Sequence, residues 1–185
     1  MRKIILPLLG LLMAGPVSAQ MPELPLPNGA PQALQAYVTG YSYWDNTSSQ
    51  TVENSHPVKH RTAGGMGTYS NPVTLAVGYQ MMNTETVLSV PAGTVFYLPR
   101  LRKYAIVEDT CDAGLSPEDG SCHTGYQGVV QFEIYVDGAL AEKRESKRCV
   151  QKLTGVQPVV MEPGPNMSVV VGPLTESGCF IFADP

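Results

Sequence analysis

Hydrophobic and polar residues alternate along several short stretches of this chain, with the period of two that is typical of β-strands. The clearest stretch covers residues 129–136. One face of it carries Val130, Phe132, Ile134 and Val136, and the other carries Val129, Gln131, Glu133 and Tyr135. Glu133 therefore belongs to a mixed polar and aromatic face, away from an apolar core where an unpaired charge is costly. On this pattern alone, the simplest interpretation of Glu133 is a solvated strand residue.

Similar stretches predict further strands, separated by turns and long loops. They cover residues 36–44, 73–79, 94–98 and 104–109, with one or two more within 156–161 and 168–171. Only residues 138–150 have a helical composition. The 18 glycines and 16 prolines, with a charged fraction of 15%, suit a turn-rich β protein. We therefore predict a mainly β fold, a small closed barrel of about six strands with long loops and one short helix.

The N-terminal 19 residues have the features of a secretory signal peptide. Arg2 and Lys3 precede an apolar run, and Val17-Ser18-Ala19 forms a small-residue cleavage site. The run is too short to span a bilayer. Because Gln20 rather than a cysteine follows, we expect a free, secreted or periplasmic protein with no membrane contact after cleavage.

The remaining chain divides into a leader and one domain. Four prolines punctuate residues 20–35, which we expect to form an extended leader. Residues 36–185 have the length of one domain, and the part from about residue 139 is expected to be a C-terminal extension. We expect this domain to act as a monomer.

The charge of the chain excludes two classes of partner. The net charge is −4 at pH 7, and removal of Arg2 and Lys3 makes it −6. Since no block of Lys and Arg stands out, neither nucleic acid nor an anionic membrane surface is an expected partner.

Four cysteines follow the signal peptide, and an even number in an exported chain indicates two disulfides. They are Cys111, Cys122, Cys149 and Cys179. Three pairings are possible, of which Cys111–Cys122 with Cys149–Cys179 is favoured because each bond closes a local loop. A Cys/His metal site is the rival interpretation, but the chain has no closely spaced CxxC pair. We therefore expect neither a metal nor another cofactor.

Three carboxylates lie at or near the ends of predicted strands, where barrel proteins often place their chemistry. Asp45 and Asp109 each end a predicted strand, and Glu133 lies within the stretch 129–136. Cleavage of a glycan needs such groups. One acid protonates the leaving oxygen, and a base or nucleophile works on the other face of the sugar.

Segments of the chain resemble the three-aspartate domain of membrane-bound lytic transglycosylase A and of many secreted bacterial and fungal proteins. The segments are Ser89–Pro99, Tyr104–Thr110 and Phe132–Tyr135, and the resemblance covers roughly residues 36–138. It implies a six-stranded double-psi β-barrel. Rare lipoprotein A, expansins, barwin and a class of inverting endoglucanases share that fold.

The resemblance implies roles for particular residues. Glu133 falls where the lytic transglycosylase has its catalytic acid, and Asp109 falls on an aspartate that supports this acid. The endoglucanases carry their base in a first-strand Tyr-Trp-Asp motif, which Tyr43-Trp44-Asp45 resembles. The chain departs from the pattern by having Glu in place of the catalytic Asp, and by an insertion over residues 111–128.

Aromatic and polar side chains near these carboxylates are candidate sugar contacts, since aromatic rings stack on the apolar faces of pyranoses. Ordinary barrel packing is the competing interpretation for each ring. The predicted substrate-binding residues are Trp44, Tyr41, Tyr43, Tyr69, Tyr135, Gln131 and Thr110. Trp44 is the foremost of them, because it is the single tryptophan and adjoins Asp45.

We therefore expect an exported protein that acts on a cell-wall polysaccharide. The leading hypothesis is cleavage of peptidoglycan strands by a lytic transglycosylase or muramidase-like reaction, with Glu133 as general acid and base. Two alternatives stay open. One is an expansin-like module that binds or loosens the wall without cleaving it, and the other is an inverting hydrolase of plant polysaccharide with Asp45 as base.

Overall fold

The computed structural model describes residues 24–45, 53–111 and 119–183. The predicted signal peptide, residues 1–19, lies outside these ranges, as does the first part of the leader. The described chain contains eight strands and two helices. The strands are β1 (Gln32–Tyr41), β2 (Val73–Val77), β3 (Tyr79–Met82), β4 (Glu85–Leu88), β5 (Val95–Leu98), β6 (Lys103–Thr110), β7 (Val130–Tyr135) and β8 (Gly155–Met161), and the helices are α1 (Ser121–Thr124) and α2 (Lys143–Leu153).

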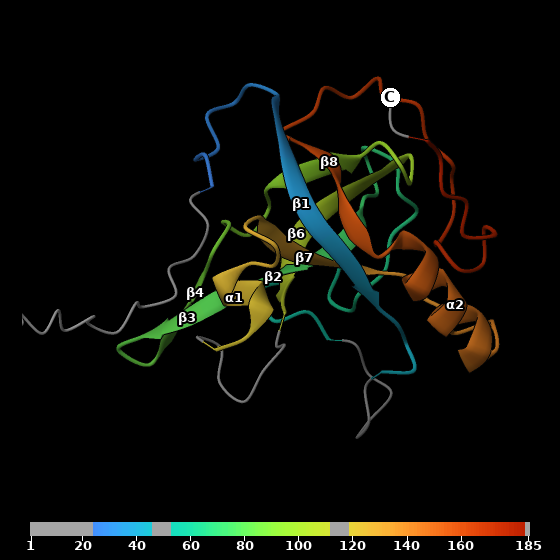
Figure 1. Ribbon diagram of the computed structural model, residues 1–185, viewed down its shortest axis with the longest axis horizontal. Coiled ribbons are helices and arrows are strands. Elements are labelled where there is room, and N and C mark those ends of the chain that lie inside the picture. The colour runs from blue at the N-terminus through green and yellow to red at the C-terminus, as the bar shows by residue number, and fades with distance from the viewer. Residues whose placement is uncertain (1–23, 46–52, 112–118, 184–185) are drawn as a thin grey trace, which may run out of the picture.

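Six strands close into a barrel in the order β1-β7-β2-β6-β5-β8, with α2 beside the end of β1 (Figure 1). β1 pairs in parallel with β7, and β2 with β6, while the other four pairs are antiparallel. Closure gives every strand of the barrel two hydrogen-bonded neighbours and leaves no free edge. The predicted mainly β fold with a closed six-stranded barrel is confirmed.

The first strand begins earlier and ends earlier than the sequence pattern predicts. Its first residues pair with β8, where Gln32 lies opposite Met161, so the end of the leader is part of the barrel. The strand stops at Tyr41 because the chain turns at once, with the amide of Asp45 bonded to the carbonyl of Ser42 (3.1 Å).

A hairpin of β3 and β4 was not predicted. The predicted strand 73–79 is interrupted at Gly78, where an added Cβ would lie 2.0 Å from the carbonyl oxygen of Cys122. The chain then leaves the barrel and β3 pairs with β4 alone, so the hairpin projects beyond the barrel on the side of α1 (Figure 1).

Two other predicted elements differ from the structure. The helix predicted at residues 138–150 begins and ends later, as α2. It begins later because Gly138 has a φ of 97° and holds the chain in a turn. Residues 168–171 are irregular rather than a strand. Within the described part of the chain, no helix has both the length and the apolar character needed to cross a membrane.

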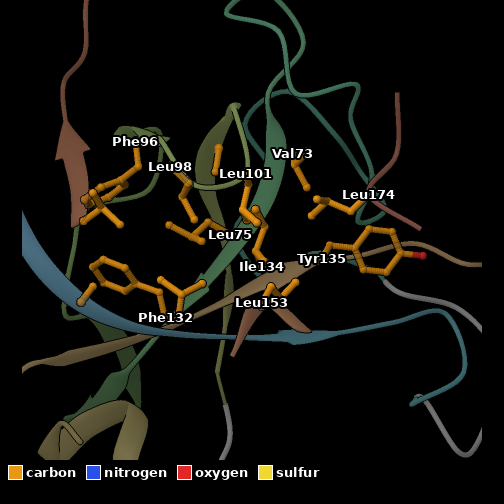
Figure 2. Close-up of a cluster of buried hydrophobic side chains, with 14 of the residues drawn as sticks. Val73, Leu75, Phe96, Leu98, Leu101, Phe132, Ile134, Tyr135, Leu153 and Leu174 are labelled. Atoms are coloured by element: carbon orange, nitrogen blue, oxygen red, sulfur yellow. The ribbon is translucent and has the colours of Figure 1, made fainter. Parts of the chain in front are cut away.

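The core lies inside the barrel and contains the apolar face that the sequence predicts for β7. On β7, Val130, Phe132 and Ile134 are all buried, as predicted for that face. Phe132 packs on Phe96 with ring centroids 5.0 Å apart. Figure 2 shows Phe96, Phe132 and Ile134 in one cluster, with Leu153 of α2 and Leu174 packed into it. Helix α2 and the C-terminal segment are thus held by the core itself.

The C-terminal segment, residues 162–183, crosses the barrel without regular structure. Three barrel side chains hold it by donating to its backbone carbonyls. Tyr104 and Tyr97 donate from their hydroxyls to Gly164 and Ser168, each at 2.6 Å, and the buried amine of Lys103 donates to Val170 and Gly172.

Two disulfides join the added parts of the fold to the barrel. Cys111–Cys122 connects the end of β6 to α1, and Cys149–Cys179 connects α2 to the C-terminal segment. Both pairings favoured from the sequence are therefore confirmed.

One buried carboxylate attaches the loop between residues 53 and 71 to β6. Glu108 is 0% exposed and accepts hydrogen bonds from the backbone amides of Val58, Lys59 and His60. Its second oxygen accepts one from Nδ1 of His60 (2.7 Å). Desolvation opposes ionisation, but these bonds prevail and lower the pKa of Glu108 below its ordinary value. Glu108 is therefore a structural anchor.

Candidate functional site

Glu133 lies in the middle of β7, on the outer face of the barrel. Its cross-strand neighbours are Thr39 on β1 and Ala76 on β2, two small side chains that leave space above the strand. Gln131 and Tyr135, which flank it on the same face, are buried, whereas Glu133 itself is partly exposed. The carboxyl group is therefore neither inside the core nor free in bulk water.

A cleft of about 440 Å³ opens over Glu133. Its walls come from the end of β1 with the turn that follows, from β7, and from one side of α2. The lining residues are Gly40, Tyr41, Ser42, Trp44, Asp45, Glu133, Lys143, Lys147 and Val150. Four residues singled out from the sequence thus meet in one concave place, although they come from two strands and a turn.

The surroundings of Glu133 favour its protonated form. Burial, together with the negative charges of Asp45 and Asp109, raises the pKa of Glu133 from 4.5 to about 7. No side chain or amide within the described ranges donates a hydrogen bond that would counteract this shift. A carboxyl group with this pKa populates both protonation states near neutral pH, as a general acid and base must.

The disulfide Cys111–Cys122 forms part of the apolar surroundings of this carboxyl group. Both cysteines are buried, and their sulfurs lie within 4.8 Å of each other and of a carboxylate oxygen of Glu133. Because the two sulfurs are bonded to each other, they act here as an apolar wall that keeps water from one side of the acid.

Asp109 does not line the cleft but is hydrogen-bonded to Tyr41, which does. Its Oδ1 accepts hydrogen bonds from the amides of Ser55 and Thr110, and its Oδ2 accepts one from the hydroxyl of Tyr41 (3.1 Å). Burial and the charge of Asp109 raise the pKa of Tyr41 well above its usual value, so the phenol keeps its proton. Asp109 is thus a fixed negative charge that reaches Glu133 through space.

Asp45 and Trp44 belong to the turn that follows β1. Asp45 Oδ2 accepts hydrogen bonds from the amide (2.7 Å) and hydroxyl (2.8 Å) of Ser42, which fix the carboxylate at the rim of the cleft. Trp44 donates from Nε1 to the carbonyl of Gly138 (2.9 Å). Tyr43 meets the indole edge-on at 5.4 Å between centroids. These contacts hold Trp44 as a flat apolar side wall.

Comparison with known proteins shows to which family the chain belongs. Residues 33–180 match the family described as the DDB_G0273701 N-terminal domain. The chain belongs to this family. A Dictyostelium discoideum relative, described as uncharacterized protein DDB_G0273701/DDB_G0273221, is 32% identical over 83 residues, which are 45% of this chain and 33% of the relative. The chain spans about a third of the length of this curated relative. No solved structure matches the chain.

Some predicted sugar contacts lie outside the Glu133 cleft. Tyr135 is 3% exposed and belongs to the core cluster. Gln131 is also buried, with its amide nitrogen 3.5 Å from the sulfur of Cys122. Tyr69 packs edge-on against Tyr104 with centroids 5.3 Å apart. The rings of Tyr135 and Tyr69 and the amide of Gln131 therefore contact other protein side chains and do not line the Glu133 cleft.

Thr110 lies in a different depression. It lines a second, open cleft of about 560 Å³ between the β3–β4 hairpin and the loop that carries Ser55 and His56. The structure therefore does not bring Thr110 together with the residues that line the Glu133 cleft, although its amide contacts Asp109.

Two residues that line the Glu133 cleft were missed by sequence reasoning. Lys143 and Lys147 lie one turn apart on α2. Their spacing of four within the single predicted helix was the available signal. What the sequence does not reveal is which face of that helix packs on β1, and this depends on contacts between distant residues.

Proposed function

We propose that this protein cleaves a cell-wall glycan, with peptidoglycan as the leading substrate and Glu133 as the general acid and base. The observation that carries the proposal is the raised pKa of Glu133, about 7, in a cleft that also holds Asp45 and Trp44. The sequence resemblance to the three-aspartate domain, in which the catalytic acid falls at this position, supports it. The closed six-stranded barrel supports it as well.

The first step of the proposed reaction is protonation of the leaving group. Glu133, in its neutral form, gives its proton to the glycosidic oxygen while the bond from the anomeric carbon to that oxygen breaks. The leaving sugar departs as an alcohol. Asp45 and Asp109 are negative charges near the positive charge that develops on the remaining sugar, and they stabilise it. Trp44 offers an apolar surface to a pyranose ring.

The second step returns the proton. In the transglycosylase form, the 6-hydroxyl of the same sugar attacks the anomeric carbon, and Glu133, now a carboxylate, takes the hydroxyl proton. The product is a 1,6-anhydro sugar, and Glu133 regains its acid form without consuming water. Each step needs only one carboxyl group that changes its protonation state easily near neutral pH.

The presence of Asp45 in the same cleft favours a second candidate reaction. If Asp45 takes a proton from water while the water oxygen bonds to the anomeric carbon, the sugar is hydrolysed with inversion. Its two hydrogen bonds from Ser42 hold the carboxylate oriented for that role. The two reactions differ in product: anhydro ends in one, reducing ends in the other.

We also propose that the protein works outside the cytoplasm, as a monomer. Two disulfides support an oxidising compartment, and the N-terminal sequence resembles a signal peptide. Mass spectrometry of the exported protein tests the export, with Gln20 or its pyroglutamate form as the expected first residue; a first residue of Met1 in the extracellular fraction would contradict it.

Mass spectrometry of the sugars released from purified peptidoglycan and from cellulose tests the proposed reaction. We expect anhydro-terminated fragments from peptidoglycan, and Glu133→Gln should lower their rate of release at least about 100-fold. The Gln variant should still bind the insoluble wall. Glu145→Gln, which alters an exposed carboxylate of α2 outside the cleft, is the matched control and should retain full activity.

The other outcomes each remove part of the proposal. Reducing ends that depend on both Glu133 and Asp45 would replace the transglycosylase reaction by inverting hydrolysis. Release from cellulose alone would replace peptidoglycan as substrate. Binding of the wall without any released sugar would leave a non-catalytic wall-binding module, and unchanged release by Glu133→Gln would remove this residue from the mechanism.

A further inference from the structure

Helix α2 concentrates positive charge on an acidic protein. It carries five of the chain's 12 lysine and arginine residues within 11 positions, and one acidic residue. The whole chain has a net charge of −4. The basic residues of this acidic chain therefore gather on one exposed helix.

Two of these cations face the cleft that contains Glu133. Lys143 and Lys147 are four residues apart, so they project from the same side of α2, and both line the cleft together with Val150 one turn further on. Both side chains are exposed. Neither has an acidic partner within 4.0 Å among the residues that the structure describes, so both ammonium groups are available to a ligand.

The two sides of the cleft therefore carry groups of opposite charge. Its barrel side carries the carboxyl groups of Glu133 and Asp45, and its helix side carries the ammonium groups of Lys143 and Lys147. A neutral glycan would leave the two cations unused. A ligand with a carboxylate on one side and a glycosidic bond on the other would match both halves.

We infer that Lys143 and Lys147 bind a carboxylate of the substrate, and that the substrate is an acidic glycan. This inference rests on the proposed function and narrows its substrate class. In a peptidoglycan strand such a carboxylate is present on the lactyl ether of the muramic sugar or on the peptide attached to it. A pair of ammonium groups one helical turn apart recognises either as a negative charge at a fixed distance from the bond that is cut.

The inference is tested by calorimetric affinity for three soluble oligosaccharides with the same N-acetylated β-1,4 backbone. One is neutral chitotetraose, one is a peptide-free peptidoglycan tetrasaccharide with lactyl carboxylates, and one is the same tetrasaccharide with its peptides. The Glu133→Gln protein is used, so that no ligand is consumed. We expect at least a tenfold preference for the acidic sugars, falling with added salt.

Charge-matched double variants identify the residues responsible. Lys143→Gln with Lys147→Gln should abolish the preference for acidic sugars while keeping the affinity for chitotetraose. Arg148→Gln with Lys152→Gln removes the same charge from exposed positions of α2 that do not line the cleft, and it should keep the preference. Tighter binding of the peptide-bearing ligand than of the peptide-free one assigns the carboxylate to the peptide. Weaker binding assigns it to the lactyl group, because attachment of the peptide converts the lactyl carboxylate into a neutral amide, and equal binding shows that either carboxylate is accepted.

Equal affinity for the neutral and acidic sugars, a preference retained by the Lys143 and Lys147 double variant, or failure of all three sugars to bind would each overturn the inference. These results are distinguishable from failure of the proposed function. Charge-selective binding without bond cleavage by the wild-type protein would overturn catalysis alone, whereas cleavage without charge selectivity would overturn this inference alone.

Discussion

Two glutamates on neighbouring parts of the barrel show how surroundings rather than residue type decide a role. Glu108 is wholly buried but receives hydrogen bonds from three backbone amides and from His60, so its pKa is lowered. Glu133 is partly exposed, yet burial and two negative neighbours raise its pKa to about 7. The hydrogen-bonded group is suited to structure, and the group without donors is suited to proton transfer.

The first prediction at the residue scale is that Glu133→Gln stabilises the fold at alkaline pH. The folded pKa, about 7, lies above the unfolded one, so the contribution of Glu133 is fully present below about pH 4.5 and is lost as pH rises through 7. The neutral amide has no such loss. Urea unfolding should show the variant more stable than wild type by roughly 1–3 kcal/mol at pH 8, and little different at pH 4.

Glu145→Gln, at an exposed site of α2, serves as the control and should follow the wild-type pH profile. A Glu133→Gln protein whose stability keeps the wild-type dependence between pH 5 and 8 would show that this carboxyl group has an ordinary pKa.

The second prediction concerns Glu108. Because its folded pKa is lowered, its contribution is present above the unfolded pKa and is lost as pH falls through the folded value. Glu108→Gln removes the negative charge that the amides bond to and puts an NH2 group in place of the oxygen that accepts from Nδ1 of His60, and it should cost about 2–4 kcal/mol in urea unfolding at pH 7. Glu53→Gln, an exposed residue near the same loop, should cost less than about 0.5 kcal/mol.

Limited proteolysis is an independent test of the anchoring role of Glu108. The loop between residues 53 and 71 should be cut faster in Glu108→Gln than in wild type, since its amides lose a charged acceptor and His60 loses the oxygen that accepts from its Nδ1. A variant with wild-type stability and no new cleavage there would contradict the anchoring role.

At the scale of elements, α1 and the disulfide at its second residue form a wall that no strand pattern predicts. Cys122 of α1 is bonded to Cys111 at the end of β6, and both sulfurs lie near Glu133. Gly78 lets α1 approach, because any side chain there would strike the backbone of Cys122. The wall therefore determines how far water reaches the acid.

We predict that Cys111→Ala with Cys122→Ala lowers the pKa of Glu133 from about 7 toward 4.5, because water then reaches the carboxyl group from the side of α1. The pKa is read from the carboxyl carbon in an NMR titration. Cys149→Ala with Cys179→Ala removes the other disulfide, which joins α2 to the C-terminal segment, and should leave this pKa unchanged. A Glu133 pKa that stays near 7 in the first variant would contradict the role of the wall.

The elements that the sequence reveals are those governed by local alternation. The alternation in residues 129–136 correctly predicts that Val130, Phe132 and Ile134 are buried, and loop closure correctly predicts both disulfides. The β3–β4 hairpin is missed because its residues carry no alternating apolar face inside a core. The cleft is only half predictable, since Lys143 and Lys147 reach it through the packing of α2 on β1, a long-range contact.

At the scale of the whole molecule, the C-terminal segment is held by buried donors of the barrel. Lys103 is 1% exposed, and burial lowers its pKa to about 8. Its amine donates to two carbonyls of the segment rather than to a carboxylate. The segment in turn presents its own amides at Val170 and Gly172 to the carbonyls of Arg102 and Met66.

We predict that Lys103→Met loosens this segment while the barrel stays folded. Loss of the two contacts should accelerate hydrogen exchange at the amides of Val170 and Gly172 by at least about tenfold, with little change in β7. Lys152→Met, at an exposed site of α2, is the control and should leave these rates unchanged. Equal protection of both amides in Lys103→Met and wild type would show that the lysine does not hold the segment.

The lowered pKa of Lys103 predicts an unusual dependence of the free energy of unfolding on pH in the alkaline range. Because its folded pKa, about 8, lies below the ordinary 10.5, the wild-type protein gains stability from this group as pH rises between these values. Lys103→Met should lack that gain when the two proteins are compared by urea unfolding at pH 7.5 and pH 9.5.

The hydrogen bonds that hold the C-terminal segment on the barrel have a consequence for protein engineering. Tyr97, Lys103 and Tyr104 all donate hydrogen bonds to main-chain oxygens. These bonds therefore depend on the path of the backbone and not on which side chains the C-terminal segment carries. Outward side chains such as Met167 and Val171, 39% and 58% exposed, are therefore free to be exchanged. A randomised library confined to these outward positions would keep the barrel intact and would turn this strip of surface into a display site for new binding sequences.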